Sequence, residues 1–239
     1  MLCIGTHIIT GPANTARCRL LTHLNGVNGG NVFTDLSRSS DGVHTFTQLG
    51  AILPTTSTVE SEFGGASIIH NSTNALQVNG NAYRWNFGIR PFTVDFWVRL
   101  IAIYGTNILC GVYDTPRVKS SWAIRHDATL KVYLSSSGIA DNAILNTGIT
   151  LAINTWYHIC FRRPTSSGNI EFYINGIRYI NTAFGNIYAS SREVLLGNQY
   201  GVYPACSTYG IVGYIDEFRI TSDARYPLSA RFTVPNREN

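Results

Sequence analysis

The sequence is poor in charged residues, and its basic residues are not concentrated in one place. Only 13% of the 239 residues are charged, and the net charge of +4 comes mostly from arginines spread singly along the chain. Nucleic-acid-binding proteins usually gather their basic residues in one patch or along one helix. The dispersed charge therefore argues against nucleic acid as a partner and allows only a mild attraction to anionic glycans or cell surfaces.

Long apolar runs are missing as well. No stretch approaches the roughly 20 apolar residues that a membrane-spanning helix needs. The opening MLCIGTHIITG lacks the basic region and the long apolar region of a secretory signal. We therefore expect a soluble protein without membrane insertion that folds in a reducing cytoplasm.

The usual catalytic and metal-binding motifs are also absent. The five cysteines are an odd number with no CxxC spacing, which predicts buried free thiols and not a disulfide framework or a zinc site. The six histidines are dispersed, and there is no GxSxG, HExxH or GxxxxGK(S/T) motif. We therefore expect a protein that is not an enzyme and has no certain cofactor.

The chain is rich in residues that favour strands and tight turns, with 22 glycines, 13 tyrosines and 11 phenylalanines. Short runs with alternating polarity are separated by clusters of Gly, Asn, Pro or Ser, and no stretch keeps a helical period. These features predict an all-β protein with one sandwich domain. The predicted strands are 16–24, 45–49, 67–69, 75–78, 92–100, 107–112, 121–126, 130–135, 156–163, 169–174, 177–181, 194–197 and 214–220.

Three segments of the chain are distinguished by their composition. Residues 1–15 have no clear period and are expected to form an N-terminal arm. Residues 16–234 contain no linker or composition shift and are expected to form the sandwich. Residues 235–239 are expected to be a flexible tail.

A hairpin is predicted around Asn175 and Gly176, because a two-residue type I′ turn needs positive φ at both central residues. The opposed pairs in this register are Ile174–Ile177, Tyr173–Arg178 and Phe172–Tyr179. The face predicted to join the core carries Ile170, Phe172, Ile174, Ile177 and Tyr179. Along 93–100, the face predicted to join the core carries Val94, Phe96, Val98 and Leu100.

Five sequence blocks, taken in order, resemble a known family. They are LLTHLNG with FTD, SEFGGAS, FTVDFWV, WYHI with FYING, and GYIDEFRI running on to ARY. This order resembles the laminin-G-like branch of the concanavalin A-like lectin/glucanase fold, of the type found in bacteriophage tail and virion proteins. The resemblance implies a two-sheet antiparallel jelly-roll sandwich.

The resemblance also implies a function in the virion. We expect a non-enzymatic structural or surface protein, a tail-fibre or head-decoration component assembled in the host cytoplasm. Its partners would be other virion proteins, further copies of itself in a homo-oligomer, and host-surface glycans. The alternatives are a calcium-dependent carbohydrate-binding lectin that is not tied to a particle and, more remotely, a glycan hydrolase.

Relatives suggest where a metal or a catalytic acid would lie. Relatives often bind calcium with an acid from an N-terminal strand and the acid of the IDE strand, which correspond here to Asn25 and Asp216. An alternative reading is a structural hydrogen bond from Asp216 to the backbone. Hydrolysis is disfavoured because adjacent Asp216 and Glu217 would point to opposite faces of a strand.

Ligand contacts are expected from two aromatic regions. Tyr173 and Arg178 lie on the second face of the predicted hairpin. The loop 198–209 is rich in tyrosine and amide side chains and contains Tyr200, Tyr203 and Tyr209. Aromatic rings and amides of this kind recognise sugars or proteins.

Overall fold

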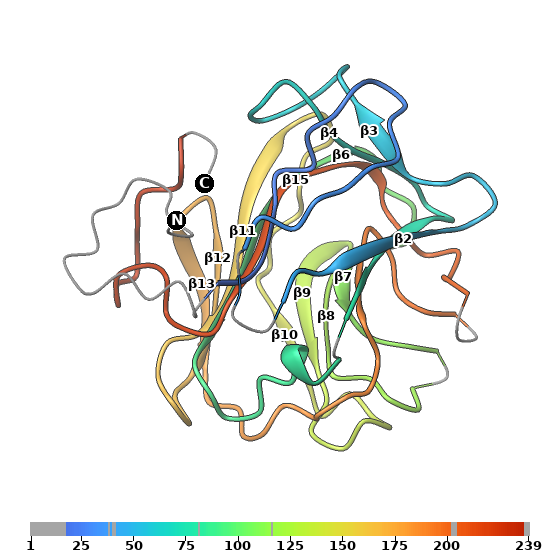
Figure 1. The fold of residues 1–239 in the computed structure, drawn as a ribbon. Coiled ribbons are helices and arrows are strands. Elements are labelled where there is room, and N and C mark those ends of the chain that lie inside the picture. Colours follow the sequence, from blue (N-terminus) through green and yellow to red (C-terminus); the bar gives the residue numbers. More distant parts are fainter. Residues whose placement is uncertain are drawn as a thin grey trace.

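The computed structural model describes residues 18–37, 39, 42–80, 82–115, 117–201 and 205–236. The strands of this region form two antiparallel sheets packed face to face, joined by long loops (Figure 1). The predicted all-β, two-sheet jelly-roll sandwich is therefore confirmed. The predicted arm lies outside the described residues, and only Pro235 and Asn236 of the predicted tail are described.

The larger sheet has eight strands in the described part of the chain, in the order β13-β12-β11-β6-β15-β4-β3, with β1 paired to β15. Its strands are β1 (Cys18–Thr22), β3 (Thr55–Ser57), β4 (Ser67–Asn71), β6 (Phe92–Ala102), β11 (Trp156–Arg163), β12 (Ile170–Ile174), β13 (Ile177–Thr182) and β15 (Val212–Thr221).

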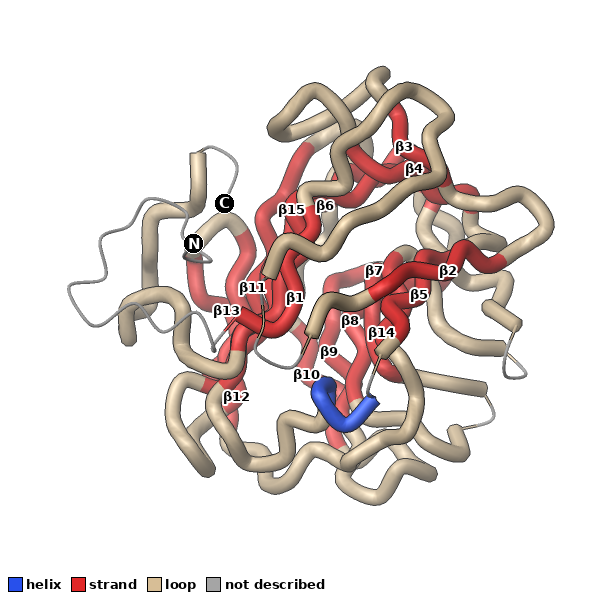
Figure 2. The backbone as a smooth tube through the Cα atoms, in the orientation of Figure 1, coloured by secondary structure: helices blue, strands red, loops and turns tan. Residues whose placement is uncertain are grey.

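The smaller sheet has seven strands among the described residues, in the order β10-β9-β8-β7-β14-β5-β2. Its strands are β2 (Thr45–Leu49), β5 (Ala75–Asn79), β7 (Thr106–Val112), β8 (Trp122–Asp127), β9 (Thr129–Leu134), β10 (Ala143–Asn146) and β14 (Val194–Leu196). A short 3₁₀ helix, η2 (Ala82–Trp85), lies at one end of the sandwich (Figure 2). Within the described residues, no helix has both the length and the hydropathy of a membrane span.

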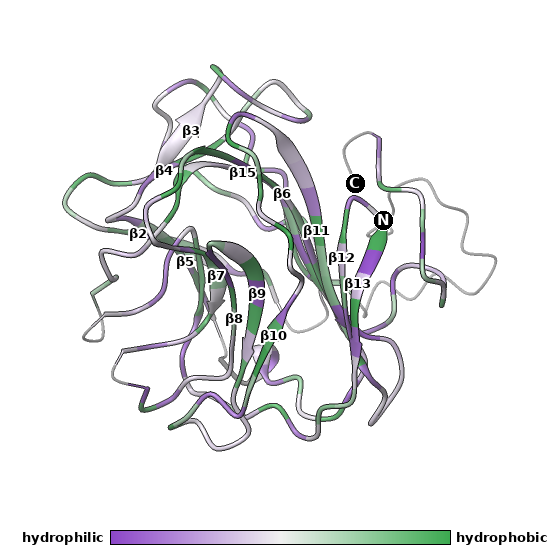
Figure 3. Ribbon diagram, turned by 180° about the vertical axis from the view of Figure 1, so that it is seen from behind, coloured by the Kyte–Doolittle hydropathy of each residue, from purple (hydrophilic) through white to green (hydrophobic). Residues whose placement is uncertain are grey.

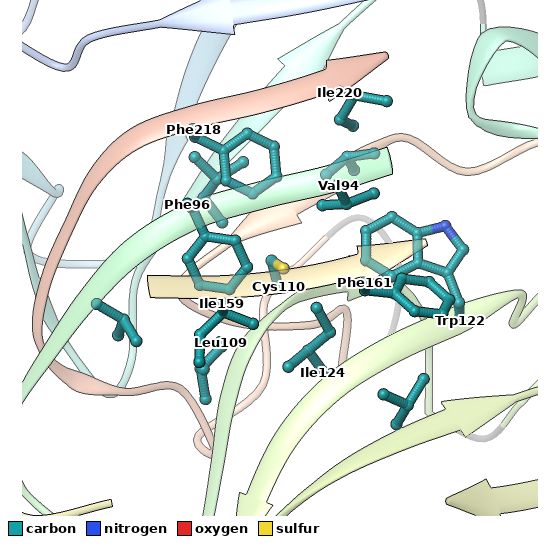
Figure 4. Close-up of a cluster of buried hydrophobic side chains, with 14 of the residues drawn as sticks. Val94, Phe96, Leu109, Cys110, Trp122, Ile124, Ile159, Phe161, Phe218 and Ile220 are labelled. Atoms are coloured by element: carbon teal, nitrogen blue, oxygen red, sulfur yellow. The ribbon is translucent and has the colours of Figure 1, made fainter. Parts of the chain in front are cut away.

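The core lies between the two sheets and follows the predicted alternation. Val94, Phe96, Val98 and Leu100 all point inward from β6, as predicted. The ring of Phe96 lies 5.5 Å from that of Phe218 on β15, and the ring of Trp122 on β8 lies 5.7 Å from that of Phe161 on β11 (Figure 4). Aromatic and branched side chains from both sheets thus interdigitate, which is the packing expected of a sandwich.

The hairpin between β12 and β13 has the predicted turn. Its register agrees with the prediction next to the turn and differs farther from it. Asn175 and Gly176 both have positive φ, and Tyr173 pairs with Arg178. A bulge then shifts the register, so that Phe172 pairs with Ile180 in place of Tyr179. Ile180 is therefore buried, whereas Tyr179 and Ile177 are exposed, which corrects the predicted core face. The colouring of β13 in Figure 3 shows this mixture of hydrophilic and hydrophobic positions.

The outer face of β11 and β12 is covered by the segment 222–236, which we call the C-terminal strap. The strap runs beside β13 (Figure 1), where Arg178 N–H donates to the carbonyl of Ala230 and Phe232 N–H donates to the carbonyl of Gly176. Tyr226 and Phe232 stack at 3.9 Å, and Phe232 packs against Tyr173. The second face of the hairpin is therefore largely interior.

The state of the cysteines matches the prediction in part. Cys110, Cys160 and Cys206 are free thiols. Burial raises the pKa of the Cys110 and Cys160 thiols well above the ordinary value, so both are unreactive packing residues. Cys18 is disulfide-bonded, and the prediction of free thiols is wrong for this residue.

Candidate functional site

The predicted ligand residues on the hairpin lie under or beside the C-terminal strap. Tyr173 is fully buried, and its hydroxyl donates to Oε2 of Glu171 at 2.8 Å. Arg178 keeps a quarter of its side chain exposed and pairs with Oε1 of Glu171 at 2.8 Å. These contacts make the pair part of the packing beneath the strap, and the structure removes Tyr173 from the candidate ligand contacts.

The three tyrosines of the loop 198–209 have different surroundings. Tyr200 is fully buried, with its hydroxyl 3.0 Å from Oε1 of Gln77, so it too is removed from the candidate ligand contacts. Tyr203 lies outside the described residues. Tyr209 is 53% exposed, and its carbonyl accepts a hydrogen bond from the backbone of Ile108 on β7. Among the described loop tyrosines, Tyr209 is thus the one that a ligand can reach.

The two residues predicted as calcium ligands, Asn25 and Asp216, have different surroundings. Oδ2 of Asp216 accepts the backbone N–H groups of Glu62 and Phe63 at 2.9 and 3.1 Å, and its Oδ1 accepts that of Glu217 at 2.8 Å. Burial raises the pKa of this carboxyl to about 7. Asn25 is exposed in the loop after β1. In the described residues, no group of three acidic, histidine or cysteine side chains could hold a metal ion.

The arrangement at Asp216 matches the structural alternative, a carboxylate that accepts backbone hydrogen bonds. The next residue, Glu217, sits in a bulge of β15 with φ of 52°, and its Oε1 lies 2.6 Å from Nδ1 of His23. Both acids are therefore occupied by protein partners. This donor set does not fit a calcium ion, and calcium binding stays a prediction.

The densest charged cluster is sealed beneath the C-terminal strap. Asp95 on β6 contacts Arg219, Arg225, His158 and the hydroxyl of Tyr226. Burial lowers the pKa of His158, because it disfavours the charged imidazolium. Such a cluster resembles a catalytic constellation in composition, but its members are buried and bonded to one another. We assign it a structural role.

A partly exposed polar cluster lies on the outer face of the seven-stranded sheet, where Tyr113 and Tyr133 are buried and the Arg125 side chain is 15% exposed. Strands β8 and β9 pair in register, and alternate residues of each strand point away from the core. Five side chains gather there, and we call them the Arg125 face: Tyr113, Arg125, Asp127, Lys131 and Tyr133. Gly111 and Ala123 are paired in the next row, and Ala123 is fully buried in a cluster with Tyr113 and Tyr133.

The guanidinium of Arg125 lies over an aromatic ring. Its Cζ is 4.2 Å from the ring centre of Tyr133 and 5.9 Å from that of Tyr113. The hydroxyl of Tyr133 donates to Oδ2 of Asp127 at 2.5 Å, and burial together with this bond raises the pKa of Tyr133 to about 12. Tyr133 therefore stays neutral and serves as a rigid platform for the arginine.

A second acid–tyrosine pair supports the other side of the Arg125 face. The hydroxyl of Tyr113 donates to Oδ1 of Asp141 at 2.5 Å, and Arg117 pairs with Oδ2 of the same carboxylate at 3.1 Å. Burial raises the pKa of Tyr113 as well. Both rings are thus fixed by hydrogen bonds at their outer ends.

Backbone pairing connects the Arg125 face to Tyr209. Ile108 on β7 bridges to Gly210, the residue after Tyr209, and also pairs with Arg125. Because neighbouring strands lie about 4.8 Å apart, the backbones of Gly210 and Arg125 are about 10 Å apart. Lys131 on β9 and Asn146 on β10 continue the same row. The row therefore combines two cations and an amide with Gly210, and the exposed Tyr209 directly precedes that glycine.

The sequence analysis identified Tyr209 but missed Tyr113, Arg125, Lys131 and Tyr133. A signal for three of them was present, because Arg125, Lys131 and Tyr133 occupy the non-core positions of the predicted strands 121–126 and 130–135. Reading both strands together would have placed a ring beside two cations. The position of Tyr113, just beyond β7, had no such signal.

The fold and this outer face define a lectin-like jelly-roll sandwich without a recognisable metal centre in the described residues. The chain belongs to the concanavalin A-like lectin/glucanases superfamily, whose family model matches residues 70–229. The matched region runs from β4 to beyond β15, so it includes the Arg125 face. A comparison with curated proteins found no match.

Solved structures with the same fold include known binding domains. Domain 4 of AbnA, a GH43 extracellular arabinanase from Geobacillus stearothermophilus, solved with arabinotriose, is 16% identical with a TM-score of 0.61 and covers 87% of this chain and 94% of that domain. A structure of botulinum neurotoxin type C, described as entering cells through two ganglioside molecules, is 14% identical with a TM-score of 0.61. The serotype D binding domain is 13% identical with a TM-score of 0.59.

The extent of these matches differs. Each neurotoxin structure covers 87% of this chain, whereas this chain spans about half of each neurotoxin structure, 48% and 49%. At such low identity, the likeness establishes the shared fold. It does not transfer a ligand or a binding residue.

Proposed function

We propose that this chain is a non-enzymatic carbohydrate-binding domain whose ligand lies on the outer face of the seven-stranded sheet. The observation that carries the proposal is the row from Gly210 to Arg125, with the exposed Tyr209 directly before Gly210. An exposed tyrosine ring offers a stacking surface, and the nearby guanidinium offers fixed hydrogen-bond donors. Sugars bind to proteins through this combination of aromatic surface and a few placed polar groups.

Binding is favoured over hydrolysis by the state of the acids on this face. A glycosidase places two carboxyl groups on opposite sides of one bond. Here Asp127 and Asp141 each accept a tyrosine hydroxyl, and each lies beside an arginine. Both therefore support the aromatic platform and are not placed to act on a substrate.

The proposal is tested by removing the exposed ring. Wild-type protein is screened on a glycan array, and the affinity of the best ligand is measured by isothermal titration calorimetry. Tyr209→Ala should lower that affinity at least tenfold. Tyr179→Ala is the matched control, because Tyr179 is similarly exposed at 41% but lies on β13 of the other sheet. Equal affinity of the two variants, or no glycan binding by the wild type, would contradict the proposal.

A location in a virus particle is a further proposal, and it rests on the order of sequence blocks given above. Nothing in the structural matches points to bacteriophage tail proteins. In this proposal the chain assembles in the host cytoplasm as a homo-oligomer on the tail or head, and the sugar-binding face is directed outward. Detection of the chain by mass spectrometry in purified particles would support it, and its absence from particles would refute it.

A further inference from the structure

Arg125 is a cation whose outer edge is open. Its Cζ lies 4.2 Å from the ring centre of Tyr133, and 15% of the side chain is exposed. The side chain contacts the rings of Tyr113 and Tyr133 and lies near Asp127, and within the described residues its terminal nitrogens Nη1 and Nη2 have no hydrogen-bond partner. The arginine therefore presents unpaired N–H donors beside an aromatic ring.

Asp127 does not form a hydrogen-bonded ion pair with Arg125. Its Oδ2 lies 3.6 Å from Nε of Arg125, which is too far for a hydrogen bond, and the same oxygen accepts the short bond from Tyr133. Nε of Arg125 and Oδ1 of Asp127 are both buried without partners among the described residues. The two side chains are thus neighbours with poor pairing geometry.

A second cation lies directly across the sheet. Lys131 is the β9 residue opposite Arg125 in the β8–β9 register, and its Nζ donates to the carbonyl of Asp127. Like charges at directly opposed positions are destabilising. With Arg117 included, three cations lie beside two acids, Asp127 and Asp141, which leaves a net charge of +1 among these five side chains. An anion bound between Arg125 and Lys131 would relieve this repulsion.

We infer that the ligand of the Arg125 face is an acidic saccharide, recognised through a sugar carboxylate. The two carboxylate oxygens match the two terminal N–H groups of Arg125, which allows a bidentate pair. Lys131 supplies the second positive charge, and the adjoining sugar units extend along the row toward Tyr209. This inference deepens the proposed carbohydrate-binding function and rests on it.

The test separates charge recognition from sugar recognition. The probes are a galacturonic acid oligosaccharide and its fully methyl-esterified form, which has the same backbone without the carboxylate charge. Wild-type protein should bind the acidic form at least tenfold more tightly than the esterified form, as measured by calorimetry. Arg125→Gln should lose at least tenfold in affinity for the acidic form. Arg125→Lys should retain part of that affinity, because lysine keeps the positive charge but lacks the paired N–H groups of the guanidinium.

Three controls accompany these variants. Lys131→Gln should weaken binding by a smaller factor, and it provides a second variant if Arg125→Gln does not fold. Arg178→Gln removes an arginine from β13 of the other sheet, whose partner Glu171 keeps Arg162, and should bind like the wild type. Thermal melts confirm that each variant is folded at the temperature of the titration.

The outcomes distinguish the two proposals. The acidic-sugar inference would be overturned if the wild type bound the acidic and esterified forms with equal affinity and Arg125→Gln had the same affinities as the wild type. Carbohydrate binding would then still stand. Equal binding of poly-glutamate and the acidic oligosaccharide would also overturn the inference, because it would show general attraction to polyanions. Failure to bind any saccharide would overturn both.

Discussion

The hydroxyl of Tyr226 donates a 2.5 Å hydrogen bond to Oδ2 of Asp95. Tyr226 belongs to the C-terminal strap and Asp95 to β6, so this bond fastens the strap to the middle of the eight-stranded sheet. Asp95 also provides the negative charge for Arg219 and Arg225, which contact the same carboxylate at 3.4 and 2.6 Å. The carboxylate of Asp95 therefore connects β6 to β15 and to the C-terminal strap.

Asp95→Asn should lower the free energy of unfolding by about 3–5 kcal/mol, because it leaves two arginines without their buried counter-charge. Tyr226→Phe removes a single hydrogen bond and should cost about 1–3 kcal/mol. Urea denaturation followed by tryptophan fluorescence measures both changes. An Asp95→Asn variant within 1 kcal/mol of the wild type would show that the cluster does not depend on this acid.

The turn of the β12–β13 hairpin offers a second stability test. Oδ1 of Asn175 accepts the backbone N–H of His158 at 2.8 Å, so Asn175→Ala should cost about 1–3 kcal/mol. Gly176 has a φ of 74°, and a Cβ there would collide with the carbonyl of Phe232 in the strap. Gly176→Val should therefore destabilise the fold more than Asn175→Ala, with both measured by chemical denaturation. Loss of glycan binding at unchanged stability would contradict this role.

His70 should make stability depend on pH below neutrality. Burial lowers its pKa to about 4, while the unfolded chain keeps an ordinary value of about 6.5. The unfolded state therefore binds the His70 proton first as pH falls, and the contribution of His70 to stability declines between about pH 6.5 and pH 4 by on the order of 3 kcal/mol. His70→Asn, which keeps a donor near Asn74, should flatten this decline in denaturation curves. An unchanged slope would show that His70 is not the group responsible.

The carboxylate of Asp216 should stabilise the fold without calcium. It accepts three backbone hydrogen bonds, so Asp216→Asn should lower stability by about 1–3 kcal/mol. The loss should be the same in excess calcium and in excess chelator, as measured by thermal denaturation. A calcium-dependent rise in the melting temperature of the wild type, absent in Asp216→Asn, would instead support the metal site predicted from Asn25 and Asp216.

Alternation and turn chemistry were sufficient to predict most of the sandwich. The inward positions of β6 and the Asn175–Gly176 turn were read correctly, because both follow from local geometry. The strands β3 and β10 were missed; the three polar residues of β3 carry no alternating signal, and β10 has only four residues. The bulge that exposes Tyr179 was missed because register beyond a turn is set by tertiary packing.

The site was harder to predict than the fold. Periodicity shows which residues share a strand face, but it does not show what covers that face. Tyr173 and Arg125 both occupy outward positions of their strands, yet the strap buries Tyr173 while Arg125 keeps an open edge. The covering segment lies more than 50 residues along the chain from Tyr173, so no local pattern near Tyr173 could reveal it.

The central position of β15 affects how the protein is made. This strand pairs with β6, β4 and β1, yet it follows all three in the sequence. At roughly 10 residues per second, a ribosome needs about 20 s to travel from β1 to β15. During that time the edges of β6, β4 and β1 lack their shared partner and can pair with other chains. Aggregation of the nascent chain is therefore favoured until β15 emerges.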